Sequence, residues 1–85
     1  MTTETAADVA TVEITSKLSR VWMFCEVAIE YAAASEAEAG WTAFRKGLHV
    51  TSNIDNSWGR ARALAKLAST IIELVDPTKS ARSRP

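Results

Sequence analysis

One long stretch of helix-forming residues constrains this chain more than any other feature. From Asp8 to Ser35 the sequence contains neither glycine nor proline. Plotted at 100° per residue, its apolar residues gather on one face that spans about 120°. These residues are Ile14, Leu18, Val21, Trp22, Cys25, Ala28, Ile29 and Ala32. The pattern predicts a helix of about 27 residues, which would be about 40 Å long.

A second apolar strip runs along the same predicted helix. Phe24, Val27 and Tyr31 follow one another at helical spacings of three and four. Together the two strips cover more than half of the circumference, and an 85-residue chain cannot surround so long a helix completely. We therefore expect this strip to meet another copy of the chain or a protein partner. The alternative is that it packs under the later helices of the same chain.

Two further helices are predicted after the long one. Gly40 either ends the preceding helix or is a weak point within one. The spacing of Ala37, Trp41, Phe44 and Leu48 then predicts a short helix over 41–49. Residues 50–57 are rich in Ser, Thr, Asn and Asp, which indicates a loop in which Asp55, Asn56 or Ser57 can cap a following helix. A helix over 57–75 follows, with a predicted core stripe of Ala61, Leu64, Ala68, Ile71, Ile72 and Val75.

The fold class that these patterns predict is all-α. We expect a helical hairpin or a small three-helix arrangement, assembled as a homo-oligomeric bundle because a core this small is marginal alone. Alanine supplies 15 of the hydrophobic residues, which thins that core further. The single domain is expected over residues 8–76, where Asp76-Pro77 stops the last helix. Residues 1–7 are expected to be a disordered N-terminus and residues 77–85 a disordered basic tail.

The formal net charge of zero conceals two halves of opposite sign. Residues 1–38 carry seven acidic side chains against Lys17 and Arg20. Residues 39–85 carry eight basic side chains against Asp55, Glu73 and Asp76. One interpretation is that the two halves pack together and neutralise each other. The other is that the basic half contacts an acidic ligand or partner.

The residue inventory argues against an enzyme and against a resident cofactor or metal. The chain has one cysteine and one histidine, too few for an internal disulfide or a conventional zinc site. Cys25 lies on the main apolar face, where a free thiol behaves as a small hydrophobe. His49 lies at a predicted helix end, where a cation interacts favourably with the dipole. Glu26 and Glu30 share a helix face, which we interpret as solvated or salt-bridged.

Candidate binding residues lie in the last predicted helix. Arg60, Arg62 and Lys66 follow Trp58, and arginine recognises phosphate through its forked donors while an aromatic ring can stack on a base. This segment is a candidate phosphate or nucleotide site, although arginine and lysine also cover ordinary solvent-facing helix surfaces. Trp58 begins the helix away from its main stripe, which favours exposure or an interface. The predicted interface set is Trp22, Phe24, Val27, Tyr31 and Trp58.

One segment resembles a known family. Ser16-Lys17-Leu18, Met23-Phe24-Cys25 and Ala28-Ile29 are similar to a helix of phage-encoded sponge proteins that sequester cyclic nucleotides of the bacterial CBASS immune system. The resemblance covers residues 16–29. It implies a small, all-helical, non-enzymatic protein that forms oligomers and binds a cyclic nucleotide between subunits. Lys17 is the matching position that would contact a ligand phosphate.

The preferred functional prediction is a non-enzymatic helical binding protein. It would act as a homo-oligomeric adaptor, inhibitor or regulator through contacts with a protein partner. The first alternative is a cyclic-nucleotide sponge, as the resemblance implies. The second is a nucleic-acid-binding regulator that uses the last helix and the tail residues Lys79, Arg82 and Arg84, which the neutral overall balance disfavours. The sequence predicts no membrane span and no export signal, so we expect a cytoplasmic protein.

Overall fold

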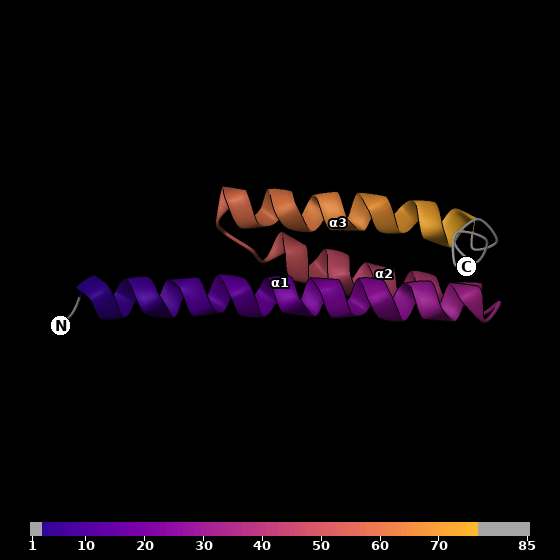
Figure 1. Cartoon of the computed structure of the whole chain (residues 1–85), viewed down its shortest axis with the longest axis horizontal. Coiled ribbons are helices and arrows are strands. Elements are labelled where there is room, and N and C mark those ends of the chain that lie inside the picture. The colour runs from indigo at the N-terminus through magenta and orange to yellow at the C-terminus, as the bar shows by residue number, and fades with distance from the viewer. Residues whose placement is uncertain (1–2, 77–85) are drawn as a thin grey trace, which may run out of the picture.

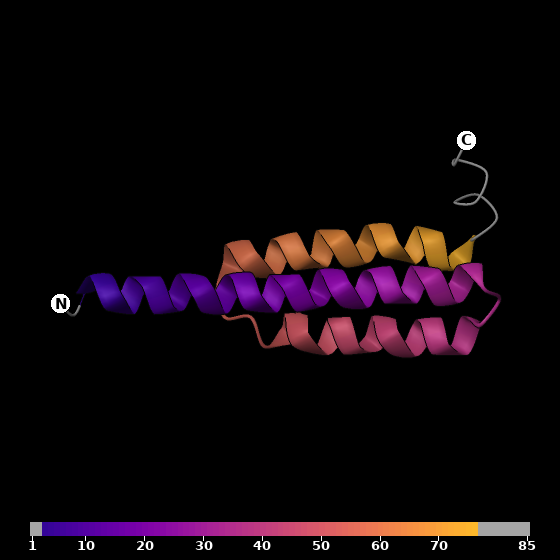
Figure 2. The ribbon, with the colours of Figure 1, turned by 60° about the horizontal axis from the view of Figure 1, so that its bottom comes forward.

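Three helices in an up-down-up arrangement make up the fold. The computed structural model describes the backbone of residues 3–76 and the side chains of residues 15–76. These residues form α1 (Thr3–Ala33), α2 (Ala37–Ser52) and α3 (Ser57–Val75), with no strand among them. All three pairs of helices are in contact. Figure 1 shows α2 and α3 on the same side of α1, and the turned view of Figure 2 shows α1 between them. The all-α prediction is confirmed, and of the two expected arrangements, a helical hairpin or three helices, the chain adopts the three-helix one.

Helix α1 extends beyond the bundle at its N-terminal end. Figures 1 and 2 show its first turns without a neighbouring helix on either side. The helix begins at Thr3, earlier than the predicted start at Asp8. The predicted basic tail over 77–85 lies outside the described residues, as do the side chain of Ile14 and residues 1–2. No described helix combines the length and the apolar character needed to cross a bilayer.

The turn between α1 and α2 shows that Gly40 does not end the first helix. Helix α1 ends at Ala33, and Ser35 adopts a left-handed conformation with φ of 65°. The carbonyl of Tyr31 accepts hydrogen bonds from the amides of Ala34 at 3.1 Å and Glu36 at 2.8 Å, which close the end of the helix. Gly40 lies buried inside α2, so the helix end is set by Ser35 and not by the glycine.

Gly40 and Gly47 allow α2 to approach α1 closely. A Cβ atom at Gly40 would lie 3.1 Å from the carbonyl oxygen of Ala28, and one at Gly47 would lie 3.3 Å from Cβ of Phe24. Both distances are tighter than ordinary van der Waals contact between carbon and its neighbours. The close crossing of α1 and α2 therefore depends on these two missing side chains.

The core consists mainly of small and medium-sized residues from all three helices, together with Phe44 of α2 and Ile54 of the α2–α3 loop. Its buried hydrophobic members are Val21, Cys25, Ala28, Ala32, Ala43, Phe44, Ile54, Ala63, Leu67 and Leu74. The main face predicted for α1 is confirmed at Val21, Cys25, Ala28 and Ala32, with Leu18 and Trp22 packed against it. In α2, Phe44 is buried and Trp41 packs against the core, whereas Ala37 and Leu48 are exposed.

The core stripe predicted for α3 is wrong, although the helix itself spans the predicted residues. Leu64, Ile71, Ile72 and Val75 are exposed, as are Ala61 and Ala68. The buried residues are instead Gly59, Ala63, Leu67, Thr70 and Leu74. Helix α3 is thus turned so that a face with smaller residues meets α1 and α2. Its N-cap falls within the predicted group, because Asn56 Oδ1 accepts a 2.8 Å hydrogen bond from the amide of Gly59.

Candidate binding groove

The predicted phosphate-binding residues make contacts within the chain. Lys17 Nζ donates to the carbonyl of Asn53 at 2.8 Å, and Arg60 Nη1 donates to the carbonyl of Ile54 at 2.8 Å. These bonds hold the α2–α3 loop against the middle of α1 and the first turn of α3. The guanidinium of Arg62 lies over the ring of Trp58, 5.1 Å from its centroid.

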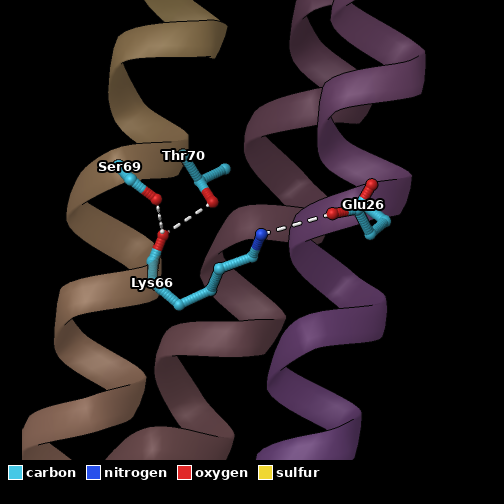
Figure 3. Close-up of polar contacts among 4 residues, drawn as sticks. All are labelled: Glu26, Lys66, Ser69 and Thr70. Atoms are coloured by element: carbon cyan, nitrogen blue, oxygen red, sulfur yellow. Dashed lines mark hydrogen bonds and ion pairs between the residues drawn. The ribbon is translucent and has the colours of Figure 1, made fainter.

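Lys66 links α3 to α1. Its Nζ atom lies 3.2 Å from Glu26 Oε2 (Figure 3) and 5.6 Å from the ring centroid of Trp22. Its backbone carbonyl accepts hydrogen bonds from the hydroxyls of Ser69 and Thr70 (Figure 3). The acidic and basic halves therefore meet at this contact, as the first interpretation of the charge pattern expects. Arg62 also lines a hollow of about 370 Å³ against α1, which none of Lys17, Arg60 and Lys66 lines.

Cys25 occupies the core position that the sequence predicts. Its side chain is fully buried beneath α3. Burial raises the pKa of the Cys25 thiol, against the opposing effects of a hydrogen bond with Thr70 and the nearby charge of Lys66. The thiol is therefore protonated at neutral pH, the opposite of what a nucleophile needs.

A groove between α1 and α2 collects most of the exposed apolar side chains of α1. We define the α1–α2 groove as three neighbouring hollows with shared walls. The first has a volume of about 450 Å³, and the second, of about 280 Å³, shares Phe24, Thr42 and Lys46 with it. The third, of about 380 Å³, shares Val27 and Tyr31 with the second. The predicted second strip of α1, Phe24, Val27 and Tyr31, forms one wall of this groove.

The two ends of the groove carry opposite charge. Arg20, Arg45, Lys46 and His49 line the first hollow around Phe24. Glu30 and Glu36 line the third hollow. All six charged or titratable side chains are exposed. The centre between them is apolar, with Met23, Phe24, Val27 and Tyr31 on the α1 side.

Sequence reasoning missed the basic end of the groove. The signal was present, because Thr42, Arg45, Lys46 and His49 follow the i, i+3, i+4, i+7 spacing of one helix face. Arg20 belongs to a different helix and was connected to them only by the packing of α1 on α2. Within the described residues, no group of three His, Cys, Asp or Glu side chains is placed to hold a metal ion.

Of the predicted interface residues, Val27, Tyr31 and Trp58 are exposed, and Trp58 at 62% is among the most exposed large apolar residues. Phe24 is half-buried in the groove wall, and Trp22 of α1 is half-buried with Lys66 over its ring. No protein-family model, curated protein or solved structure matches this chain.

Proposed function

We propose that this chain is a non-enzymatic binding protein that holds an amphipathic helix of a protein partner in the α1–α2 groove. The observation that carries the proposal is the continuity of the groove, with an apolar centre between ends of opposite charge. In this role the protein acts as an adaptor, inhibitor or regulator. We place it in the cytoplasm, in keeping with its free, buried thiol.

The length of the groove favours a polypeptide ligand. The lining residues run from Arg20 of α1 to Ala34, one residue past the end of that helix, which corresponds to about 21 Å at the rise of a helix. A partner helix of about 14 residues spans that distance. Such a helix would pack against both α1 and α2 and complete a four-helix bundle, covering apolar side chains that the chain itself leaves exposed.

The charges of the groove specify the chemistry of the partner helix. Acidic side chains at one end of the partner would lie beside Arg20, Arg45 and Lys46, and basic side chains at its other end would lie beside Glu30 and Glu36. Exposed charges of this kind guide orientation and association rate more than they add affinity. The affinity itself would come from apolar residues of the partner that contact Val27 and Tyr31.

The experiment compares two substitutions at similarly exposed apolar positions. Val27 in the groove is 37% exposed, and Leu48, which lies on α2 outside the groove, is 43% exposed. A photo-crosslinking residue at Tyr31 identifies the partner segment, and a synthetic peptide of that segment is then titrated against each variant. Val27→Glu should weaken binding about tenfold or more, whereas Leu48→Glu should leave it within about twofold. Equal losses, or a crosslinked segment without an apolar stripe and an acidic end, would contradict the proposal.

A cyclic nucleotide is the second candidate ligand, and the basic end of the groove is the observation that favours it. Arg20, Arg45 and Lys46 surround the half-buried ring of Phe24, which offers cations for phosphate and a face for a base. A nucleotide would fill the first hollow and leave the rest of the groove open. A rise in melting temperature with a cyclic nucleotide, abolished by Arg45→Ala but kept in Val27→Glu, would favour this ligand over the partner helix.

A further inference from the structure

The outward face of α3 is apolar over a wide arc. Viewed along the helix, an arc of about 140° contains no charged residue. We call this arc the α3 seam; its members are Trp58, Ala61, Leu64, Ala65, Ala68, Ile71, Ile72 and Val75. All of them are exposed, with Ile72 at 57% and Val75 at 70%. Helix α3 already buries one face against α1 and α2, so its packing within the chain does not require a second apolar stripe.

The centre of the seam has the spacing of a coiled coil. Trp58, Ala61, Ala65, Ala68, Ile72 and Val75 follow one another at intervals of three, four, three, four and three. This alternation keeps one line of side chains facing a partner helix over about 26 Å. Large residues occupy the two ends of the line and three alanines occupy its middle.

We propose that the α3 seam is a homodimer interface in which two copies of α3 pack antiparallel about a twofold axis. In this register Trp58 faces the partner's Val75, Ala61 faces the partner's Ile72, and Ala65 faces the partner's Ala68. A large side chain thus meets a small or medium one in each outer layer, and alanine meets alanine at the axis. The proposal goes beyond the partner-binding function and stands without it, because the seam and the α1–α2 groove share no residue.

The size pattern is the reason to choose a second copy in this orientation. A parallel pair would place Trp58 against its own equivalent and leave three successive alanine layers with little to fill them. The antiparallel pair lets the helices approach closely at the alanines and fills both ends. At the edges, Leu64 lies beside the partner's Ile71, and Arg62 lies beside the partner's Ser69, so no like charges face each other.

Charge exchange at the axis tests the interface. Sedimentation equilibrium of the wild-type chain at roughly 100 µM should give about twice the monomer mass of 9.2 kDa. A chain with Ala65→Glu and Ala68→Glu, and another with Ala65→Lys and Ala68→Lys, should each be monomeric with unchanged helix content. Their equimolar mixture should regain the dimer mass, because each substituted position then faces the opposite charge. A monomeric wild type, or a mixture that stays monomeric, would overturn the proposal.

Cysteine crosslinking tests the orientation. Chains with Ala61→Cys and with Ile72→Cys are mixed under mild oxidation, with the native Cys25 protected by burial. The antiparallel register predicts a disulfide between the two different chains, whereas a parallel pair would crosslink Ala61→Cys chains with each other. A Leu48→Cys chain serves as the control for random collision. Val27→Glu should keep the dimer mass, which separates a failure here from a failure of partner binding in the groove.

Discussion

Helices α1 and α3 differ in where they place their most apolar faces. Helix α1 buries its most regular apolar stripe and leaves the shorter strip of Phe24, Val27 and Tyr31 at the edge of a groove. Helix α3 turns its most apolar stripe outward, with Ile72 and Val75 largely exposed. Hydrophobicity alone therefore did not decide which face of α3 entered the core.

The residues that α3 buries explain why this face, and not the more apolar one, enters the core. Gly59, Ala63 and Thr70 are small, and only Leu67 and Leu74 on that face are long. The hydroxyl of Thr70 donates to the carbonyl of Lys66 at 2.8 Å, so its burial leaves no unmet donor. In α2, Gly40, Ala43 and Gly47 have the same character. Close approach of three backbones selects small inward faces and leaves larger apolar residues for other contacts.

The largest expected effect tests the orientation of α3 directly. Leu67 is 3% exposed and Ile72 is 57% exposed. Leu67→Ala should lower the free energy of unfolding by about 2–5 kcal/mol, because it leaves a cavity in the core. Ile72→Ala should change it by about 0.5 kcal/mol or less in urea denaturation at concentrations where the chain is monomeric. Equal losses of stability in the two variants would contradict the orientation of α3, in which Leu67 faces the core and Ile72 faces outward.

The second prediction tests the close approach of the helices. Gly40→Leu places a side chain against the carbonyl of Ala28 and the methyl of Leu74. This overpacking should lower the free energy of unfolding by about 1–3 kcal/mol. Ala37→Leu, at an exposed position of the same helix, provides the control and should be nearly neutral. If both variants melt at the wild-type temperature, close packing does not explain the small inward faces.

The third prediction compares two glutamates, one on each helix. Glu73 of α3 has a buried carboxylate oxygen, Oε1, with no hydrogen-bond partner among the described residues, whereas Glu30 of α1 is exposed. Glu73 also lies in the last turn of its helix, where negative charge is unfavourable. Glu73→Met should therefore raise the free energy of unfolding by about 1 kcal/mol. Glu30→Met, measured by the same thermal melts, should raise it by less.

The smallest effect concerns the ion pair that joins the two helices. Glu26 is 62% exposed, and its 3.2 Å contact with Lys66 is open to solvent and salt. Glu26→Gln should lower the free energy of unfolding by about 0.5 kcal/mol or less. The difference from wild type should shrink in about 1 M salt, where charges are strongly screened. A loss of several kcal/mol would mean that the ion pair, and not small-residue packing, positions α3.

The sequence predicted the elements better than their orientation. The span of α3, the capping group that includes Asn56 and the inward face of α1 at Val21 and Cys25 all agree with the structure. These features depend on local backbone chemistry or on a single dominant apolar stripe. Only one part of the groove was predicted from the sequence, namely its apolar wall on α1. Its basic end was not predicted, because it combines Arg20 of α1 with Arg45 and Lys46 of α2.

The sequence alone determined that this chain is helical, where α3 begins and ends, and that α1 carries more apolar surface than one face can bury. It left open whether the first half forms one helix or two, and the structure places a turn after Ala33. Tertiary packing decided which stripe of α3 faces inward and which side chains share the groove. The physical reason is that a period reports the width and regularity of a face but not how closely two backbones can approach. At Gly40 and Gly47 the close approach of α2 to α1 depends on the absence of a Cβ atom. A hydrophobic pattern does not report this absence.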